Sequence, residues 1–182
     1  MTAVVLAVAG PGCQSMGGAA IQPVSLAGGV VTITPPGGFE TTVQPPRPGA
    51  TSQTVTFRGP AWRRGNFNNC TVRSVRIEPA DLNDESLGEF VASAARKRHA
   101  VHQSTDGLHD VSLGEPVPGR ANDPYVVRSS FTIDYTLRTS ERYWGVRSAA
   151  GDFVIIQNCG TGGSPEELAA IEDATRPLFP AP

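Results

Sequence analysis

Lysine is almost absent from this chain of 182 residues, in which every one of the 15 basic residues except Lys97 is an arginine. Acidic residues nearly balance the basic ones, and the formal net charge is only -2. A nucleic-acid-binding protein needs a strongly basic surface, so this balance argues against that function. The arginine bias, together with abundant Ala, Gly and Pro, indicates a bacterium with a GC-rich genome.

Long apolar runs are missing from the whole chain, and charged residues are scarce in its N-terminal part. No apolar stretch reaches the roughly 18 residues that a membrane-spanning helix needs. The first fifty residues contain only Glu40 and Arg47 as charged residues and are rich in Gly and Pro, so they cannot bury a core alone. We therefore expect three parts: an export signal and tether over 1–25, a Gly/Pro-rich lead-in with short strands over 26–50, and a single domain over 51–182.

The extreme N-terminus has the pattern of an export signal. Thr2–Ala9 form an uncharged, mostly apolar run, and Gly10, Pro11 and Gly12 follow immediately before Cys13. This order is similar to a bacterial lipobox, in which the cysteine receives a lipid and becomes the mature N-terminus. It departs from that motif in having no basic residue ahead of the apolar run. We expect export and lipidation at Cys13, and the alternative is an apolar tail without a signalling role.

Cysteine is scarce, with Cys13, Cys70 and Cys159 as its only occurrences. If Cys13 carries a lipid, the other two can form one disulfide. Cys70 opens an expected strand and Cys159 closes another, so antiparallel pairing of these strands would bring the two residues to the same end of the pair. The alternative is two separate buried thiols in a cytosolic protein, a compartment in which disulfides are rare.

Alternation of apolar and polar residues predicts strands over 30–34, 39–43, 53–58, 70–78, 110–114, 125–138, 142–148 and 153–159. Within 70–78 the apolar positions change face between Val72 and Val75, which suggests a β-bulge. Two helices are predicted by their N-terminal signals. Ser86 and Glu89 form a capping box, and Ser164 followed by Pro165 and Glu167 gives a second helix start.

The order strands, helix, antiparallel strands, helix predicts an α+β domain in which helices pack on an antiparallel sheet. Three segments carry a further likeness: D-E-S-L-G-E-F at 84–90, V-S-L-G-E at 111–115 and S-P-E-E-L at 164–168. With that element order they resemble the PsbP-like α/β/α sandwich and, within it, the LpqN-type lipoproteins of actinobacterial cell envelopes. The resemblance implies an exported, non-catalytic protein with a protein-binding or envelope role, and it supplies no catalytic residues and no cofactor.

The three histidines, His99, His102 and His109, lie close together in the sequence. Imidazole is the commonest transition-metal ligand, and His99 and His102 could share one helix face, so a Zn or Cu site is a candidate. The alternative is a solvated loop. No G-x-S-x-G nucleophile elbow is present, and a disulfide would remove the thiolate that Cys159 would need as a nucleophile.

Exposed aromatic and basic side chains give a candidate binding surface. Trp62, Arg63 and Arg64 fall together in an expected polar turn region. Tyr143 and Trp144 are further aromatics that could be partly exposed, although the position of Trp144 beside a strand valine favours the core.

These observations predict an exported, lipid-anchored protein on the outer face of the cell membrane, in the cell envelope. We expect it to bind a protein or another envelope component, to catalyse no reaction and to need no cofactor. Two alternatives stand beside this prediction. One is a metal-binding or hydrolytic envelope protein that uses the histidines, and the other is a phage or mobile-element protein with the same fold.

Overall fold

A computed structural model describes residues 22–44, 51–60, 68–82, 86–115, 126–133 and 136–179. The expected lipidation site, Cys13, lies outside these ranges. So do the expected binding residues Trp62, Arg63 and Arg64.

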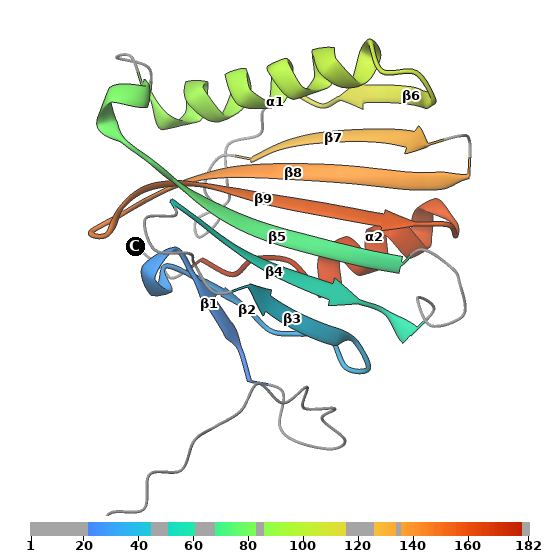
Figure 1. Cartoon of the computed structure of the whole chain (residues 1–182), viewed down its shortest axis with the longest axis horizontal. Coiled ribbons are helices and arrows are strands. Elements are labelled where there is room, and N and C mark those ends of the chain that lie inside the picture. The colour runs from blue at the N-terminus through green and yellow to red at the C-terminus, as the bar shows by residue number, and fades with distance from the viewer. Residues whose placement is uncertain are drawn as a thin grey trace, which may run out of the picture.

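Seven strands form one antiparallel sheet in the spatial order β3–β4–β5–β9–β8–β7–β6 (Figure 1). In that order the strands are β3 (Glu40–Gln44), β4 (Ser52–Arg58), β5 (Asn68–Ile77), β9 (Gly151–Thr161), β8 (Leu137–Ser148), β7 (Val126–Ile133) and β6 (Leu108–Leu113). Each neighbouring pair runs antiparallel. The α+β class with an antiparallel sheet, expected from the sequence, is confirmed.

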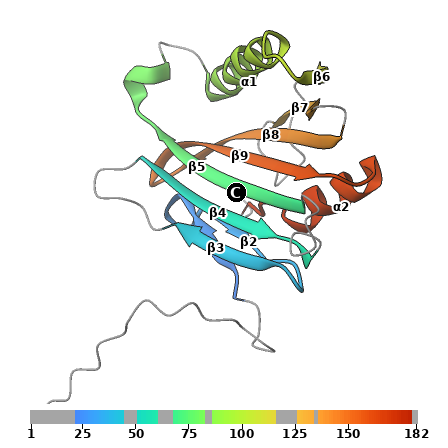
Figure 2. The same ribbon diagram turned by 45° about the vertical axis from the view of Figure 1, so that its right-hand side comes forward.

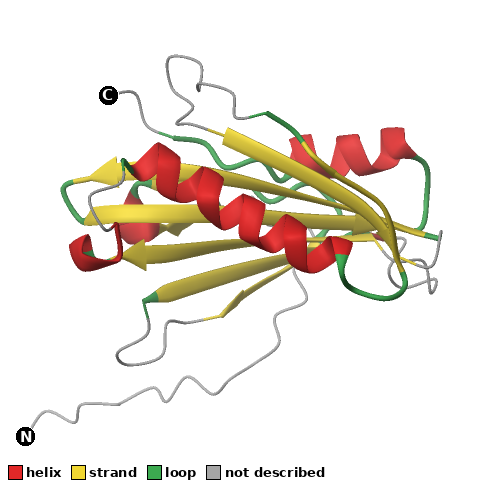
Figure 3. Cartoon of the chain, turned by 90° about the horizontal axis from the view of Figure 1, so that it is seen from above, coloured by secondary structure: helices red, strands yellow, loops and turns green. Residues whose placement is uncertain are grey.

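Helices cover opposite faces of the sheet (Figure 2). Helix α1 (Leu87–Gln103) packs against β6, β7 and β8. Figure 3 shows from above a helix that crosses the strands of the sheet. Helix α2 (Pro165–Ala174) packs on the other face. Trp144 shares a core with α2, whereas the preceding residue Tyr143 shares a second core with α1, and successive strand residues point to opposite faces. Within the described ranges, no helix combines the length and the apolar character needed to cross a membrane.

Both helices begin where the sequence predicts. At α1 the Glu89 backbone N–H donates to Ser86 Oγ at 3.3 Å, and the Ser86 backbone N–H donates to the Glu89 carboxylate at 2.9 Å. This reciprocal pair is the expected capping box, and the hydrogen bonds from Ser86 lower the pKa of Glu89. At α2 the Glu167 backbone N–H donates to Ser164 Oγ at 3.3 Å, and Pro165 occupies the first helical position.

The described residues 22–44 pack on the domain expected over 51–182 and contribute to both its core and its main sheet. The short strands β1 (Val24–Leu26) and β2 (Val31–Ile33) form a hairpin, joined by the 3-10 turn Ala27–Gly29. Leu26 and Ile33 are fully buried in the core beneath α2, and β3 is part of the main sheet. The composition of this segment does prevent it from forming a core alone, but the sheet supplies one.

The single strand expected over 125–138 is instead two strands, β7 and β8, joined by a turn. Ile133 at the end of β7 lies directly opposite Leu137 at the start of β8. Residues directly opposite each other in an antiparallel pair point to the same face, so the odd-numbered alternation continues across the turn. The pattern could not distinguish one long strand from this hairpin.

Strand β5 has no bulge, and the one expected between Val72 and Val75 is wrong. The pairing of β5 with β9 is continuous from Asn68 to Ile77. Val72 is buried in the core beneath α2, whereas Val75 and Ile77 pack in the core beneath α1. The apolar positions change face because the two faces of the sheet are covered along different stretches of this strand. After β5, a 3-10 turn (Pro79–Leu82) leads towards α1.

Candidate functional site

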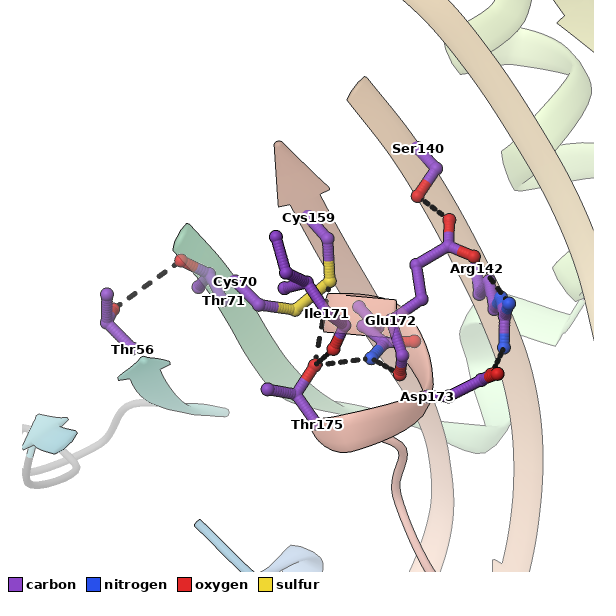
Figure 4. Close-up of a disulfide and its surroundings, with 11 residues drawn as sticks. Thr56, Cys70, Thr71, Ser140, Arg142, Cys159, Ile171, Glu172, Asp173 and Thr175 are labelled. Atoms are coloured by element: carbon purple, nitrogen blue, oxygen red, sulfur yellow. Dashed lines mark hydrogen bonds and ion pairs between the residues drawn. A yellow bond between two sulfur atoms is a disulfide. The ribbon is translucent and has the colours of Figure 1, made fainter. Parts of the chain in front are cut away.

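The expected disulfide is present between Cys70 of β5 and Cys159 of β9 (Figure 4). The two residues are direct partners in the β5–β9 register, with Cα atoms 4.0 Å apart, and both are fully buried. Cross-strand neighbours of this kind bring two side chains within bridging distance. In this form neither sulfur is available as a nucleophile or as a metal ligand.

A buried ion pair fixes α2 to the sheet beside this disulfide. The Glu172 carboxylate, on a residue only 1% exposed, lies 2.5 Å from Arg142 Nη2 of β8 and accepts a hydrogen bond from the Ser140 hydroxyl. Arg142 also reaches the exposed Asp173 carboxylate at 3.6 Å. The guanidinium and the hydroxyl compensate a charge that would be costly to bury alone.

A chain of neutral hydrogen bonds connects the end of α2 to the disulfide (Figure 4). Gln157 Nε2 of β9 donates to the Glu172 carbonyl oxygen at 2.8 Å and to Thr175 Oγ1 at 2.9 Å. Thr175 Oγ1 donates to the Ile171 carbonyl at 2.7 Å and lies 3.6 Å from Cys159 Sγ. These contacts join the helix, the central strand and the disulfide into one buried unit, and they explain the burial of so many polar groups at this position.

A second polar cluster lies on the opposite face of the sheet, beneath α1, and is centred on Glu141 of β8. This residue is 2% exposed, and its carboxylate accepts hydrogen bonds from Tyr143 Oη at 2.5 Å and from Asn158 Nδ2 at 2.8 Å. Arg98 of α1 approaches it at 3.7 Å. Burial, and then the hydrogen bond to Glu141, raise the pKa of Tyr143. The phenol therefore stays neutral and acts as a hydrogen-bond donor, not as a base.

His102 lies at the edge of this second cluster. It is 4% exposed, and its ring centroid is 4.3 Å from that of Phe131. Its Nδ1 atom is buried and has no hydrogen-bond partner among the described residues. Burial lowers the pKa of His102, and the nearby Glu141 carboxylate opposes that shift. The structure therefore favours a neutral imidazole packed against an aromatic ring.

Within the described residues, the structure does not bring the three histidines together as a group that could hold a metal ion. All three histidines lie in described segments, and the described residues include no group of three or more His, Cys, Asp or Glu side chains that could hold a metal ion. His99 and His102 do follow each other at one-turn spacing in α1. However, the His102 ring packs on Phe131, while His109 lies on the separate strand β6. Two histidines at one-turn spacing on a helix do not face a common ligand when the ring of one is packed in the core.

Other candidates have mixed outcomes. Trp144 is 1% exposed, which confirms its expected place in the core, and Tyr143, at 4% exposed, is also buried and cannot form part of a binding surface.

The sequence did not identify Glu141 and Glu172 as the central residues of the two polar clusters. One signal was available for Glu141, because it shares the strand face of Tyr143, an unusual position for a carboxylate that is not paired.

Comparison with known proteins gives distant structural similarity only. No family model matches the chain, and no curated protein matches it in sequence. Among solved structures it is similar to cyanobacterial PsbP (CyanoP) from Synechocystis sp. PCC 6803, with 15% identity, a TM-score of 0.45, and coverage of 90% of this chain and 93% of that one. It is also similar to protein CV1439 from Chromobacterium violaceum, with 14% identity, a TM-score of 0.22, and coverage of 77% and 69%.

Proposed function

We propose that this protein is exported, is held at the outer face of a bacterial cell membrane by a lipid on Cys13, and binds a protein or another envelope component. The buried disulfide between Cys70 and Cys159 is the observation that carries the proposal. Disulfides persist outside the cytoplasm and are rare within it. The proposal also includes the finer resemblance to LpqN-type envelope lipoproteins, which rests on the sequence segments at 84–90, 111–115 and 164–168.

A binding role without catalysis is supported by how the buried charged groups are used. Glu172 is engaged by Arg142 and Ser140, and Glu141 by Tyr143 and Asn158. Both carboxylates join secondary-structure elements, and the disulfide occupies the two cysteine sulfurs of the domain. A catalytic carboxylate or thiolate would instead need to reach a substrate.

Export and anchoring can be tested together in a GC-rich bacterial host that produces the full chain. We expect the wild type to incorporate an alkyne-labelled fatty acid and to fractionate with membranes. Cys13→Ser should lose both the label and the membrane association while keeping the Cys70–Cys159 bridge, which makes it a matched control for folding. Recovery of the unlabelled chain in the cytosol with reduced Cys70 and Cys159 would refute the proposal.

Partner binding can be tested by chemical crosslinking in native membranes followed by affinity capture. The surface predicted from the sequence is tested by the triple variant Trp62→Ala, Arg63→Ala, Arg64→Ala, which should lose the crosslinked partner. The control is Arg96→Ala with Lys97→Ala, two exposed residues of α1 that lie outside this predicted surface. Equal capture by both variants would remove residues 62–64 from the proposed binding site.

A further inference from the structure

The two edges of the main sheet differ in how they are protected. An edge strand has backbone N–H and C=O groups that can hydrogen-bond another strand, and proteins usually block such edges. At one edge, β6 shifts its register with β7 between His109 and Ser112, and Asp110 has a φ of 51°. Helix α1 also packs beside β6, as Figure 1 shows. Irregular pairing and the neighbouring helix both disfavour addition of another strand there.

Within the described part of the chain, the opposite edge, β3, has neither of these protections. All five of its residues pair with β4 without a register shift, and no strand in the described ranges pairs with its outer side. Its sequence, E-T-T-V-Q, contains no proline or lysine and has three consecutive β-branched residues. Four of the five residues are exposed, and Val43 is 43% exposed although it lies opposite the fully buried Val55. The strand is regular and favourable for β structure, and no described strand occupies its outer side.

We propose that β3 pairs antiparallel with β3 of a second copy of this chain, about a two-fold axis that passes through Thr42. In this register Thr42 lies opposite the partner's Thr42. Thr41 lies opposite the partner's Val43, and Glu40 lies opposite the partner's Gln44. Such an interface is isologous, because the same strand serves on both sides.

The sequence of β3 is complementary to itself in this arrangement. All five residues of each copy are paired, and the central three pairs contain only β-branched side chains, which suit cross-strand contact. Glu40 is the only charged residue of the strand. The two-fold axis places each Glu40 opposite the neutral side-chain amide of the partner's Gln44. The two Glu40 carboxylates lie at opposite ends of the interface, so like charges do not meet.

The pairing extends each sheet into that of the neighbouring copy. Five residues from each copy form a contact below the roughly 1,200 Å² typical of stable interfaces. We therefore expect a reversible dimer whose population rises with protein concentration. The pairing does not depend on the lipid anchor, although confinement to a membrane surface would raise the effective concentration.

Sedimentation velocity on the full, oxidised chain at micromolar to millimolar concentrations tests the proposal with two variants of equal charge. Thr42→Lys places two ammonium groups opposite each other on the axis and should raise the dimer Kd about fivefold. Gln44→Lys places an ammonium group opposite the partner's Glu40 twice per dimer and should lower the Kd by about two- to thirtyfold. Both positions are exposed, so each variant adds the same charge without entering the core.

A monomeric wild type at every concentration would overturn the proposal, as would a shift of both variants in the same direction. Amide hydrogen exchange on the wild type gives a second measurement that needs no variant. The amides of β3 should gain protection as concentration rises, whereas those of β6 should not. Unchanged exchange in β3 over a concentration range in which the chain dimerises would place the interface elsewhere and refute the proposed pairing.

Discussion

Four consecutive residues of β8, from Ser140 to Tyr143, serve polar clusters on opposite faces of the sheet. Ser140 and Arg142 point towards α2 and bind the Glu172 carboxylate. Glu141 and Tyr143 point towards α1 and bind each other. Strand alternation produces this division directly, because neighbouring side chains leave the strand in opposite directions. One short segment therefore helps to dock both helices.

The ion pair of Arg142 allows a matched comparison of a buried and an exposed carboxylate. Glu172→Leu should lower the free energy of unfolding by about 3 kcal/mol, because it leaves a largely buried guanidinium without its main partner. Asp173→Asn should change it by less than about 0.5 kcal/mol, because the Asp173 side chain is 71% exposed and water screens the pair. Urea denaturation at neutral pH measures both values, and equal losses would contradict the interpretation of Glu172 as the anchoring carboxylate.

His102 should make stability depend on pH in the weakly acidic range. Its pKa in the folded protein lies below the ordinary value of 6.5, because burial disfavours the charged ring. The unfolded chain therefore binds more protons below that pH, and stability should fall as the pH is lowered from 7.5 towards 5.

Urea denaturation at a series of pH values measures this effect. His102→Gln should flatten the fall, because the glutamine side chain does not bind a proton in this pH range. A variant at His102 with an unchanged pH profile would show that other groups cause it.

The close packing of α1 on the sheet depends on a glycine in the facing strand. A Cβ atom added at Gly145 of β8 would lie 2.9 Å from Leu87 Cγ and 3.1 Å from Val91 Cγ2. Both contacts are with the first part of α1: Leu87 lies within the capping box, and Val91 follows it. The helix start and the strand therefore approach as closely as a residue without a side chain permits.

Gly145→Ala should destabilise the protein by about 1–3 kcal/mol, because the first part of α1 must move away or adopt strained rotamers. Gly162→Ala is the matched control, since a Cβ there meets no atom within 4 Å, and its effect should stay within about 0.5 kcal/mol. Thermal unfolding followed by circular dichroism compares the two. If the two variants melt alike, the close approach of α1 has no energetic importance.

Elements with local signals could be predicted from the sequence, and those defined by distant contacts could not. Ser86 and Ser164 identified both helix starts because capping is a local interaction. The disulfide could be predicted because only two cysteines remained for it. By contrast, nothing near Glu172 in the sequence shows that it is buried among partners, because Ser140 and Arg142 come from another element. For Glu141, the strand face that it shares with Tyr143 was a signal of burial, but its partners Asn158 and Arg98 come from other elements. The turn between β7 and β8 was missed because it preserves the alternation.

For the molecule as a whole, the disulfide links strands in the middle of the sheet. β5 and β9 are hydrogen-bonded neighbours with other strands on both sides. The linked cysteines are 89 positions apart in the sequence. The bridge therefore limits the conformational freedom of a large part of the unfolded chain. In the chain-entropy account, the stabilisation from closing a loop increases with the length of that loop.

Removing the bridge with the double variant Cys70→Ala, Cys159→Ala should lower the free energy of unfolding by roughly 4–5 kcal/mol, as the chain-entropy account gives for a loop of this length. Urea denaturation of the variant measures the loss, and the wild type in excess reductant should show a similar one. An unchanged midpoint in both samples would mean that closure contributes nothing to stability.

The same bond also determines what happens when the backbone is cut. Helix α1 and strands β6, β7 and β8 all lie between Cys70 and Cys159 in the sequence. A protease that cleaves one peptide bond in this interval produces two fragments that remain a single covalent molecule. The nicked protein would keep both halves attached until a reductant released them.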